Sequence, residues 1–261
     1  MLRHFPQQNV SYSHKKRDYF IAAFTFFCVA VCLMSDAHAG IEKQNALGVC
    51  GWVFLVGLLL GEPIEVRVQV GIAVIFATIG EHFASPFMGG YTYRFGNVPA
   101  YVPPGHGMVY LTAVALARSG LFLRYAREIA LFVVLVCGLW SLWGISGIPD
   151  QGDAVGAMLF CVFLAYLFKG RSPLVYLAAF FITTWLELIG TAVGTWKWAA
   201  IDPVLGWSQG NPPSGVAAWY CLVDAVAIGG AAPAMNGLKN AREWVRSAKT
   251  RKNAYQGAGS E

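Results

Sequence analysis

The sequence has few charged residues for its length. Only 13% of its 261 residues are Asp, Glu, Lys or Arg, whereas 56% are hydrophobic, and the mean hydropathy is +0.51. A soluble domain carries roughly 25% charged residues, so this chain lacks the polar side chains needed to cover a surface that faces water. The composition excludes an ordinary soluble domain and favours a membrane protein.

The sequence also lacks the motifs of several common functional classes. It has no Walker or dinucleotide-binding glycine pattern, no G-x-S-x-G and no metal-type C-x-x-C pair. The six cysteines lie in apolar segments, and we interpret them as small core residues, neither disulfide-bonded nor ligands. His82 and His106 could join Glu81 and Glu187 in a metal site, or serve a haem, but no paired-histidine spacing supports this. We therefore predict no metal ion and no other cofactor.

Long apolar segments dominate what remains. Each approaches the roughly 20 residues that a membrane-spanning helix needs, and the Leu, Ala, Phe and Val content favours helices over a β-barrel. The segments are Tyr19–Met34, Ala46–Leu60, Val68–Gly80, Gly107–Leu123, Ile129–Ile148, Ala154–Phe168, Leu174–Val193 and Val216–Ala232. We predict an all-α, polytopic integral membrane protein with about seven to eight transmembrane helices.

The distribution of Lys and Arg predicts the orientation. With Lys15–Arg17 in the cytoplasm, eight helices leave all but three of the 19 basic residues on that side; the three are Lys43, Arg94 and Lys197. This is the bias that cytoplasmic loops carry, and it accounts for the net charge of +5 without a nucleic-acid partner. We expect the cytoplasmic (inner) membrane, with a cytoplasmic C-terminus.

Three regions follow from these patterns. Residues 1–40 read either as a cleaved signal peptide ending in Ala-His-Ala39 or as a first transmembrane helix. Residues 41–234 form a single transmembrane domain. Residues 235–261 form a basic cytoplasmic tail, either simply solvated or lying on anionic lipid headgroups.

Two motifs within the domain, 81–110 and 187–219, share an order of features. Each starts from an apolar helix with a glutamate, then has a glycine and two aromatics that flank one residue, and then a Pro-Pro pair before the next helix. The aromatic parts are Gly90-Tyr91-Thr92-Tyr93 and Gly194-Thr195-Trp196-Lys197-Trp198, the second with one residue inserted. In the predicted topology both motifs run from the cytoplasmic to the non-cytoplasmic side of the membrane and back. This predicts two halves of parallel topology, with a site where the halves meet.

Ionisable residues inside spans are costly and commonly functional. Glu81, Glu187 and Asp224 are therefore our candidate acid/base residues, against the alternatives of structural helix–helix hydrogen bonds or carboxylates that reach the interface. Residues that could bind a substrate, or in the aromatic cases form an interfacial belt, lie in the two motif loops. They are Tyr91, Tyr93, His106, Trp196, Trp198 and Asn211, the last also a possible helix cap.

The stretch PFMGGYTYRFGNVPAYVPP after Glu81 resembles the membrane carotenoid-biosynthesis proteins of the carotenoid 1,2-hydratase (bisanhydrobacterioruberin hydratase-like) type. That family has a Glu before Pro-Phe-Gly-x-Tyr-x-Tyr, then Val-Pro, and later Gly-x-Trp-x-Trp. Met88-Gly89 alters the spacing here, Glu187 stands where the family tends to place Asp, and the loop 211–215 departs from its usual Asn-Phe-x-Gly-Trp. The resemblance, over about a third of the chain, implies a polyisoprenoid substrate and addition of water to a double bond.

Two functions follow as hypotheses. The first is a membrane-embedded enzyme, hydratase- or lyase-like, that acts on a hydrophobic isoprenoid or lipid by carboxylic acid/base chemistry. The second is a non-catalytic subunit or assembly factor of a membrane complex, or a small-molecule carrier. The expected partners are membrane lipids, a hydrophobic small molecule and, under the second hypothesis, other membrane proteins.

Overall fold

The structure is a computed structural model that describes residues 3, 5–6 and 14–257. The outermost parts of the predicted segment 1–40 and of the predicted tail 235–261 therefore lie outside the described residues. Within the described residues the chain is mostly helical, as the long apolar segments predict. The helices are α1 (Lys16–Asp36), α2 (Ile41–Leu59), α3 (Ile64–His82), α4 (Val102–Ala117), α5 (Gly120–Arg124), α6 (Ala126–Ile145), α7 (Ala154–Lys169), α8 (Pro173–Ala192) and α9 (Ala217–Gly257).

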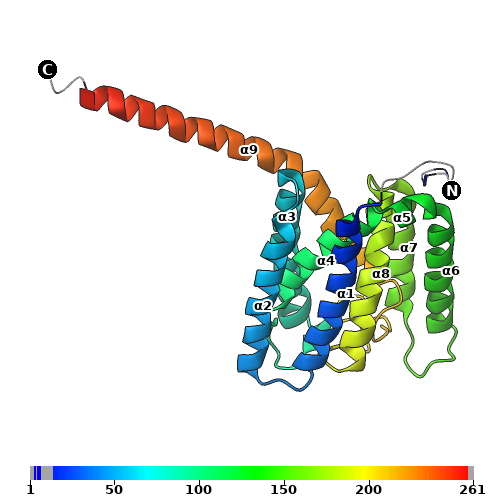
Figure 1. The fold of residues 1–261 in the computed structure, drawn as a ribbon. Helices are drawn as coiled ribbons and strands as arrows, with labels where there is room; N and C mark the ends of the chain where they lie inside the picture. Colours follow the sequence, from blue (N-terminus) through cyan, green and yellow to red (C-terminus); the bar gives the residue numbers. More distant parts are fainter. Residues whose placement is uncertain (1–2, 4, 7–13, 258–261) are drawn as a thin grey trace.

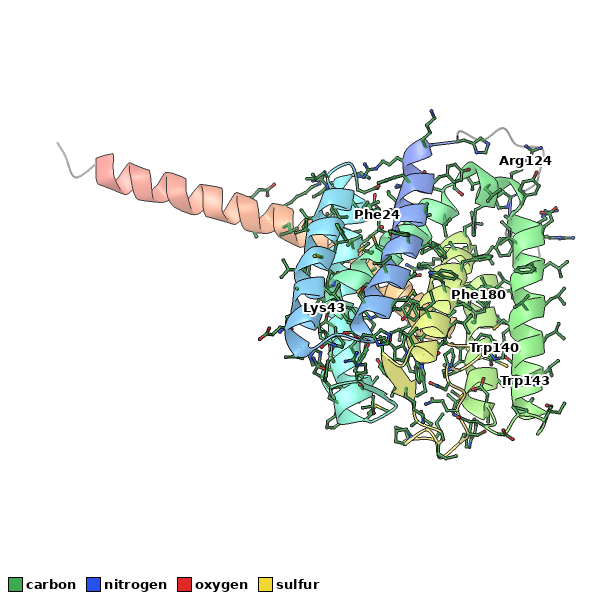
Figure 2. The ribbon with its side chains drawn as sticks, turned by 60° about the horizontal axis from the view of Figure 1, so that its bottom comes forward. Phe24, Lys43, Arg124, Trp140, Trp143 and Phe180 are labelled. Carbon is green, nitrogen blue, oxygen red and sulfur yellow. The ribbon has the colours of Figure 1, made fainter. Side chains whose placement is uncertain are left out.

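Five of the described helices are long and apolar enough to cross a membrane: α1, α3 with its extension to Phe87, α6, α8 and the first part of α9. Most of their outward side chains away from the helix ends are apolar. On α6, for example, Leu135, Leu139 and Leu142 are each more than half exposed, and Figure 2 shows the side chains of this helix pointing away from the bundle. Such a surface is stable against lipid tails and not against water, which indicates a membrane protein.

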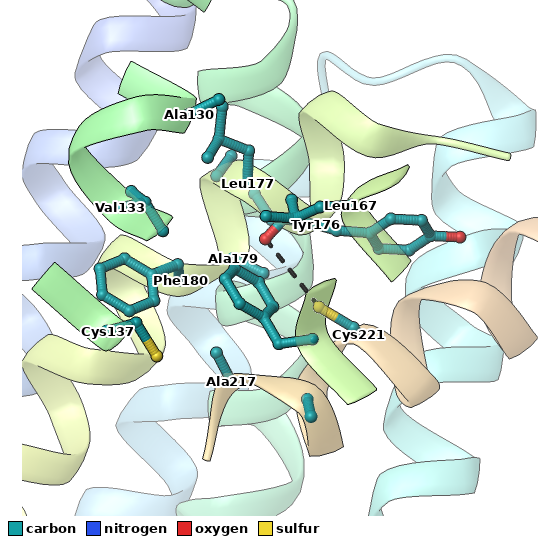
Figure 3. Close-up of a cluster of buried hydrophobic side chains, with 14 of the residues drawn as sticks. Ala130, Val133, Cys137, Leu167, Tyr176, Leu177, Ala179, Phe180, Ala217 and Cys221 are labelled. Atoms are coloured by element: carbon teal, nitrogen blue, oxygen red, sulfur yellow. Dashed lines mark hydrogen bonds between the residues drawn. The ribbon is translucent and has the colours of Figure 1, made fainter. Parts of the chain in front are cut away.

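The helices form a bundle with four central members (Figure 1). α3 packs against α4 and α9, and α8 packs against the same two helices, while α1 and α2 flank one side and α6 and α7 the other. One apolar cluster fills the space between α6, α7, α8 and α9 (Figure 3), with Phe163 and Phe180 stacked at a ring distance of 5.8 Å. A second cluster joins α1, α2, α3, α4 and α9.

One end of the bundle, here called the basic end, is where α1 begins and α4 ends (top in Figure 1). Arg118 forms two hydrogen bonds of 2.8 and 2.9 Å with the Glu62 carboxylate and another of 2.9 Å with Asp18. Arg17 adds a 3.3 Å contact with Glu62. The hydrogen bonds from Arg118 lower the pKa of Glu62, although its burial acts in the opposite direction. This ion cluster ties α1 and the α2–α3 turn to the end of α4.

The opposite end, here called the loop end, carries a small β-sheet that the sequence analysis does not predict. β1 (Tyr91–Tyr93) and β2 (Trp196–Trp198) pair antiparallel, with Tyr91 opposite Trp198 and Tyr93 opposite Trp196. Two backbone bonds extend the pair symmetrically: Arg94 N–H to Thr195 O (3.1 Å) and Ala199 N–H to Gly90 O (3.0 Å). An antiparallel pair of this kind has a local twofold axis between its two strands.

The structure corrects our alignment of the two motifs. Gly89 and Gly194, each two residues before its strand, both have a left-handed backbone, with φ of 74° and 76°. Gly89, and not Gly90, is thus the equivalent of Gly194, and no residue is inserted in the second motif. The extra residue belongs to the first motif, where α3 continues into a π-helical turn over Phe83–Phe87. A π turn accommodates one additional residue in a helix.

Other expectations are refined by the packing. α1 packs against α4 and α8, and Asp36 at its end accepts hydrogen bonds from Gln44 (2.9 Å) and Tyr101 (3.0 Å), contacts that cleavage after Ala39 would remove. All six cysteines are free. The interpretation of every cysteine as a core residue is wrong for Cys50 and Cys161, which are exposed on the apolar outside. α9 continues as one helix through position 234, with Pro233 inside it.

Candidate functional site

Glu81 lies on the last turn of α3 and receives hydrogen bonds on both carboxylate oxygens. Oε2 accepts the hydroxyls of Tyr91 (2.6 Å) and Tyr93 (2.7 Å), and Oε1 lies 2.8 Å from Nε2 of His106. The alternation of a strand places Tyr91 and Tyr93 on the same face, so both rings turn inward while Thr92 between them is exposed. His106, on the first turns of α4, completes the group from the other side.

Glu187 repeats this arrangement with different donors. Its Oε2 accepts the indole N–H groups of Trp196 (3.0 Å) and Trp198 (3.1 Å), which share one face of β2. Among the described residues, Oε1 has one hydrogen-bonding partner, the hydroxyl of Tyr220 at the long distance of 3.4 Å. An indole can only donate, so Trp196 and Trp198 hold the carboxyl group in place without taking a proton from it.

The two carboxylate groups line one cavity. Tyr220 of α9 stacks on the ring of His106, with 5.6 Å between centroids, and this contact joins the Glu187 group to the Glu81 group. The cavity has a volume of about 340 Å³, within the roughly 300–1,000 Å³ typical of small-molecule sites. Glu81 and Glu187, which the sequence placed in equivalent positions of two motifs, therefore face the same space.

The tyrosines of β1 are held in their neutral form. Burial, followed by the nearby Glu81 carboxylate, raises the pKa of Tyr91 and of Tyr93 well above the usual value for a phenol. Both hydroxyls keep their protons and act as fixed donors to Glu81. The relative exposures of Tyr91, Tyr93, Trp196 and Trp198 are 5–8%, which is too low for an interfacial aromatic belt.

Several neighbours fix the strands. Gly190 of α8 leaves space for the indole of Trp196, because a Cβ at this position would overlap the outer ring atoms. Asn211 accepts a 3.0 Å hydrogen bond from the backbone N–H of Trp198, and Gln209 donates to the carbonyl of Gly90 (3.0 Å). Asn211 is exposed and does not line the cavity. Its contact supports β2, and it is neither a helix cap nor a contact for a ligand in the cavity.

Asp224 lies apart from these groups. It is 2% exposed on α9, its Oδ2 has no hydrogen-bond partner among the described residues, and it does not line the cavity. Trp198 contacts Glu187 without lining the cavity, whereas Tyr91, Tyr93, His106 and Trp196 line it. His82 is exposed and bonds the carbonyl of Thr78, so it is turned away from Glu81. No group of three or more His, Cys, Asp or Glu that could hold a metal ion occurs in the part of the chain that the structure describes.

The sequence reading missed Tyr220 and the walls contributed by α1 and α2. The second motif, 187–219, ends at Trp219, which is 52% exposed, whereas the next residue, Tyr220, reaches Glu187. Adjacent helical residues point about 100° apart, and the motif alone does not say which one faces inward. The position of α1 and α2 along the cavity depends on helix packing, for which the apolar segments contain no signal.

No family model, curated protein or solved structure matches this chain. Functional inference therefore rests on the geometry of the site.

Proposed function

We propose that this protein is a membrane-embedded enzyme that acts on a hydrophobic lipid or isoprenoid by acid/base chemistry at Glu81 and Glu187. The observation that carries the proposal is the opposed pair of buried carboxyl groups on one apolar cavity, each held by its own set of donors. Buried carboxyl groups within spans are costly, and two of them facing the same space are difficult to explain by packing alone.

The hydrogen bonds support a division of roles between the two carboxyl groups. Two hydroxyl donors, those of Tyr91 and Tyr93, stabilise the carboxylate form of Glu81, and the His106 ring lies at hydrogen-bonding distance from its other oxygen, so we assign the base to Glu81 together with His106. Oε1 of Glu187 has only the long contact with Tyr220 in the described structure, so this oxygen can carry a proton and present it to the cavity. Glu187 is the acid, held in orientation by the two indoles.

Hydration of a double bond is the reaction that fits these roles. The proton on Glu187 is transferred to one alkene carbon, the π electron pair forms the new C–H bond, and the other carbon becomes a cation. Water attacks that carbon and its proton is transferred to Glu81 or His106, which yields an alcohol. The rings of Tyr91, Tyr93 and Trp196 that line the cavity can stabilise the transient cation. The resemblance to carotenoid hydratases supports the same reaction and a polyisoprenoid substrate.

The topology proposed from the basic residues places the basic end in the cytoplasm and the loop end on the other side of the cytoplasmic membrane. α9 then leaves the bundle on the cytoplasmic side. The strands β1 and β2 and the site above them lie near the non-cytoplasmic surface, where water for the reaction is available.

The test compares Glu81→Gln and Glu187→Gln with the wild type. The assay uses reconstituted vesicles that contain the lipid extract of a strain lacking the gene, and it measures products by mass spectrometry in isotopically heavy water. Loss of a general acid or base lowers rates by about 10²–10⁴-fold, so both variants should lose the product that carries heavy oxygen. Glu42→Gln, at an exposed position of α2, is the matched control. Flux of an unchanged compound across the vesicle membrane would indicate a carrier. Full activity of both variants would refute the proposed acid/base catalysis.

A further inference from the structure

The cavity is polar at one end and apolar along the rest of its length. The carboxyl groups of Glu81 and Glu187 and the ring of His106 form the inner end. The walls beyond them come from α1, α2 and α4. They consist mainly of apolar side chains, among them Phe27 and Val31 of α1, Phe54 of α2 and Met108 of α4.

The exposed part of this lining comes from two helices. Phe27 and Val31 of α1 are 67% and 45% exposed, and Phe54 of α2 is 40% exposed; Cys50 of α2 is exposed as well. The other residues of the lining are buried or half-buried. The mouth of the cavity therefore lies between α1 and α2, within the length of both helices.

Both ends of this mouth are closed by specific contacts. Towards the basic end, Phe24 and Phe54 meet edge to face with 5.3 Å between ring centroids. Towards the loop end, Asp36 is bonded by Gln44, and Arg94 donates to the backbone carbonyls of Asp36 and Ala39. The opening is a slot in the side of the bundle, and not a funnel that opens to water at either end.

The charges of the lining select against anionic ligands. No Lys or Arg lines the cavity among the residues that the structure describes, and apart from tyrosines and cysteines its ionisable groups are two carboxyl groups and a histidine. Arg94, close to the loop end of the slot, is committed to backbone carbonyls. A phosphate or diphosphate at the inner end would be a buried charge without a partner, which costs several kcal/mol or more, and it would face two acidic groups.

We propose that the slot between α1 and α2 is a lateral opening to the bilayer, through which an uncharged lipid enters with its reactive end towards Glu81 and Glu187. The apolar chain of this lipid lies along Phe27, Val31 and Phe54, and lipids with a phosphate or diphosphate at that end are excluded. The acid/base pair is taken as the inner end of the substrate site, so the substrate class rests on the proposed function. The route itself depends only on the shape and charge of the cavity.

The experiment uses a dodecyl alcohol with a photoreactive diazirine near the middle of its chain, and the full chain in phosphatidylcholine nanodiscs. After illumination, the labelled peptides are identified by mass spectrometry. We expect adducts on the cavity-facing residues of α1 and α2, and we expect competition by unlabelled dodecanol and not by dodecyl phosphate. Labels spread evenly over lipid-facing surfaces such as the outside of α6, or equal competition by both compounds, would overturn the proposal.

A pair of tryptophan substitutions tests the route. Cys50→Trp places a large side chain in the slot, whereas Cys161→Trp places the same side chain on the outside of α7, away from the cavity. We expect the cavity adducts to be lost in Cys50→Trp and retained in Cys161→Trp, with both proteins showing the wild-type melting temperature. Retention of the adducts in a folded Cys50→Trp protein would refute entry through the slot. If Cys50→Trp does not fold, Phe27→Trp at the same opening replaces it.

Failure of this proposal and failure of the proposed function give different results. If Glu81→Gln and Glu187→Gln keep full activity but the adducts behave as expected, the cavity binds an uncharged lipid without the proposed chemistry. If both variants lose the product but Cys50→Trp keeps its adducts, the chemistry stands and the substrate enters by another route.

Discussion

Gly190 provides a quantitative test of how Glu187 is positioned. A methyl group at position 190 would overlap the outer atoms Cη2, Cζ2 and Cζ3 of the Trp196 indole, so Gly190→Ala forces the ring to move. Overpacking of this kind costs about 1–3 kcal/mol. Displacement of the indole also breaks its hydrogen bond to Glu187, and an unmade buried hydrogen bond costs about 1–3 kcal/mol. The free energy of unfolding should therefore fall by about 2–6 kcal/mol in total.

The assay is the thermal melting temperature of the purified protein in detergent, with Gly71→Ala as the control. Gly71 is a helical glycine of α3, and no side chain or neighbouring helix lies within 4 Å of the place that a methyl group would take there. Alanine at this position should stabilise the helix by about 0.5–1 kcal/mol. Trp196→Phe removes the ring atoms that cause the overlap at position 190. In that background Gly190→Ala should cost little more than the control, and an undiminished cost would show that the clash with Trp196 is not the cause.

Two further predictions concern polar groups outside the cavity. Arg118 lowers the pKa of Glu62, so Glu62 stabilises the fold at pH values above its unfolded pKa of about 4.5, and this stabilisation is lost as the pH falls through the lower folded value. Glu62→Gln should weaken the acid dependence of the melting temperature, and Glu65→Gln, at an exposed position, should leave it unchanged. Asp153 caps α7 and accepts hydrogen bonds from the backbone N–H groups of Gly156, Gly210 and Ser214 at 2.7–3.0 Å. Asp153→Ala should therefore lower the free energy of unfolding by about 2–4 kcal/mol. Asp150 is exposed, so Asp150→Ala should lower it by less than about 0.5 kcal/mol. An equal acid dependence of the melting temperature in Glu62→Gln and Glu65→Gln, or equal melting temperatures for Asp153→Ala and Asp150→Ala, would contradict these assignments.

The sequence predicts the helices well because their length and apolarity are local properties. Each of the eight apolar segments falls within or across described helices, and the aromatic pairs of the two motifs lie in β1 and β2, which pair with each other. The number of helices that span the membrane, and their orientation, stay predictions. The reaction that the resemblance implies likewise stays a prediction, and Glu81→Gln and Glu187→Gln test it.

The features that the sequence did not predict depend on rotation and packing. The π turn after Glu81 shifts the register of the first motif by one residue, and its local sequence, Phe83–Phe87, has no distinctive pattern. Asp224 is buried away from the cavity, although its place in a span resembles that of the two glutamates. Hydropathy also does not say which faces of α1 and α2 form a cavity wall, because nearly every position on these helices is apolar.

The donors of each glutamate have a consequence for how the protein is made. Tyr91 and Tyr93 follow Glu81 by ten and twelve residues, and Trp196 and Trp198 follow Glu187 by nine and eleven. Each carboxyl group therefore finds its partners in the chain that leaves the ribosome directly after it. The first half can insert into the bilayer with Glu81 already satisfied, long before Glu187 is synthesised. The pairing of β1 with β2 and the contact of His106 with Tyr220 must wait for the second half, so the assembly of the complete site is a late step of biogenesis.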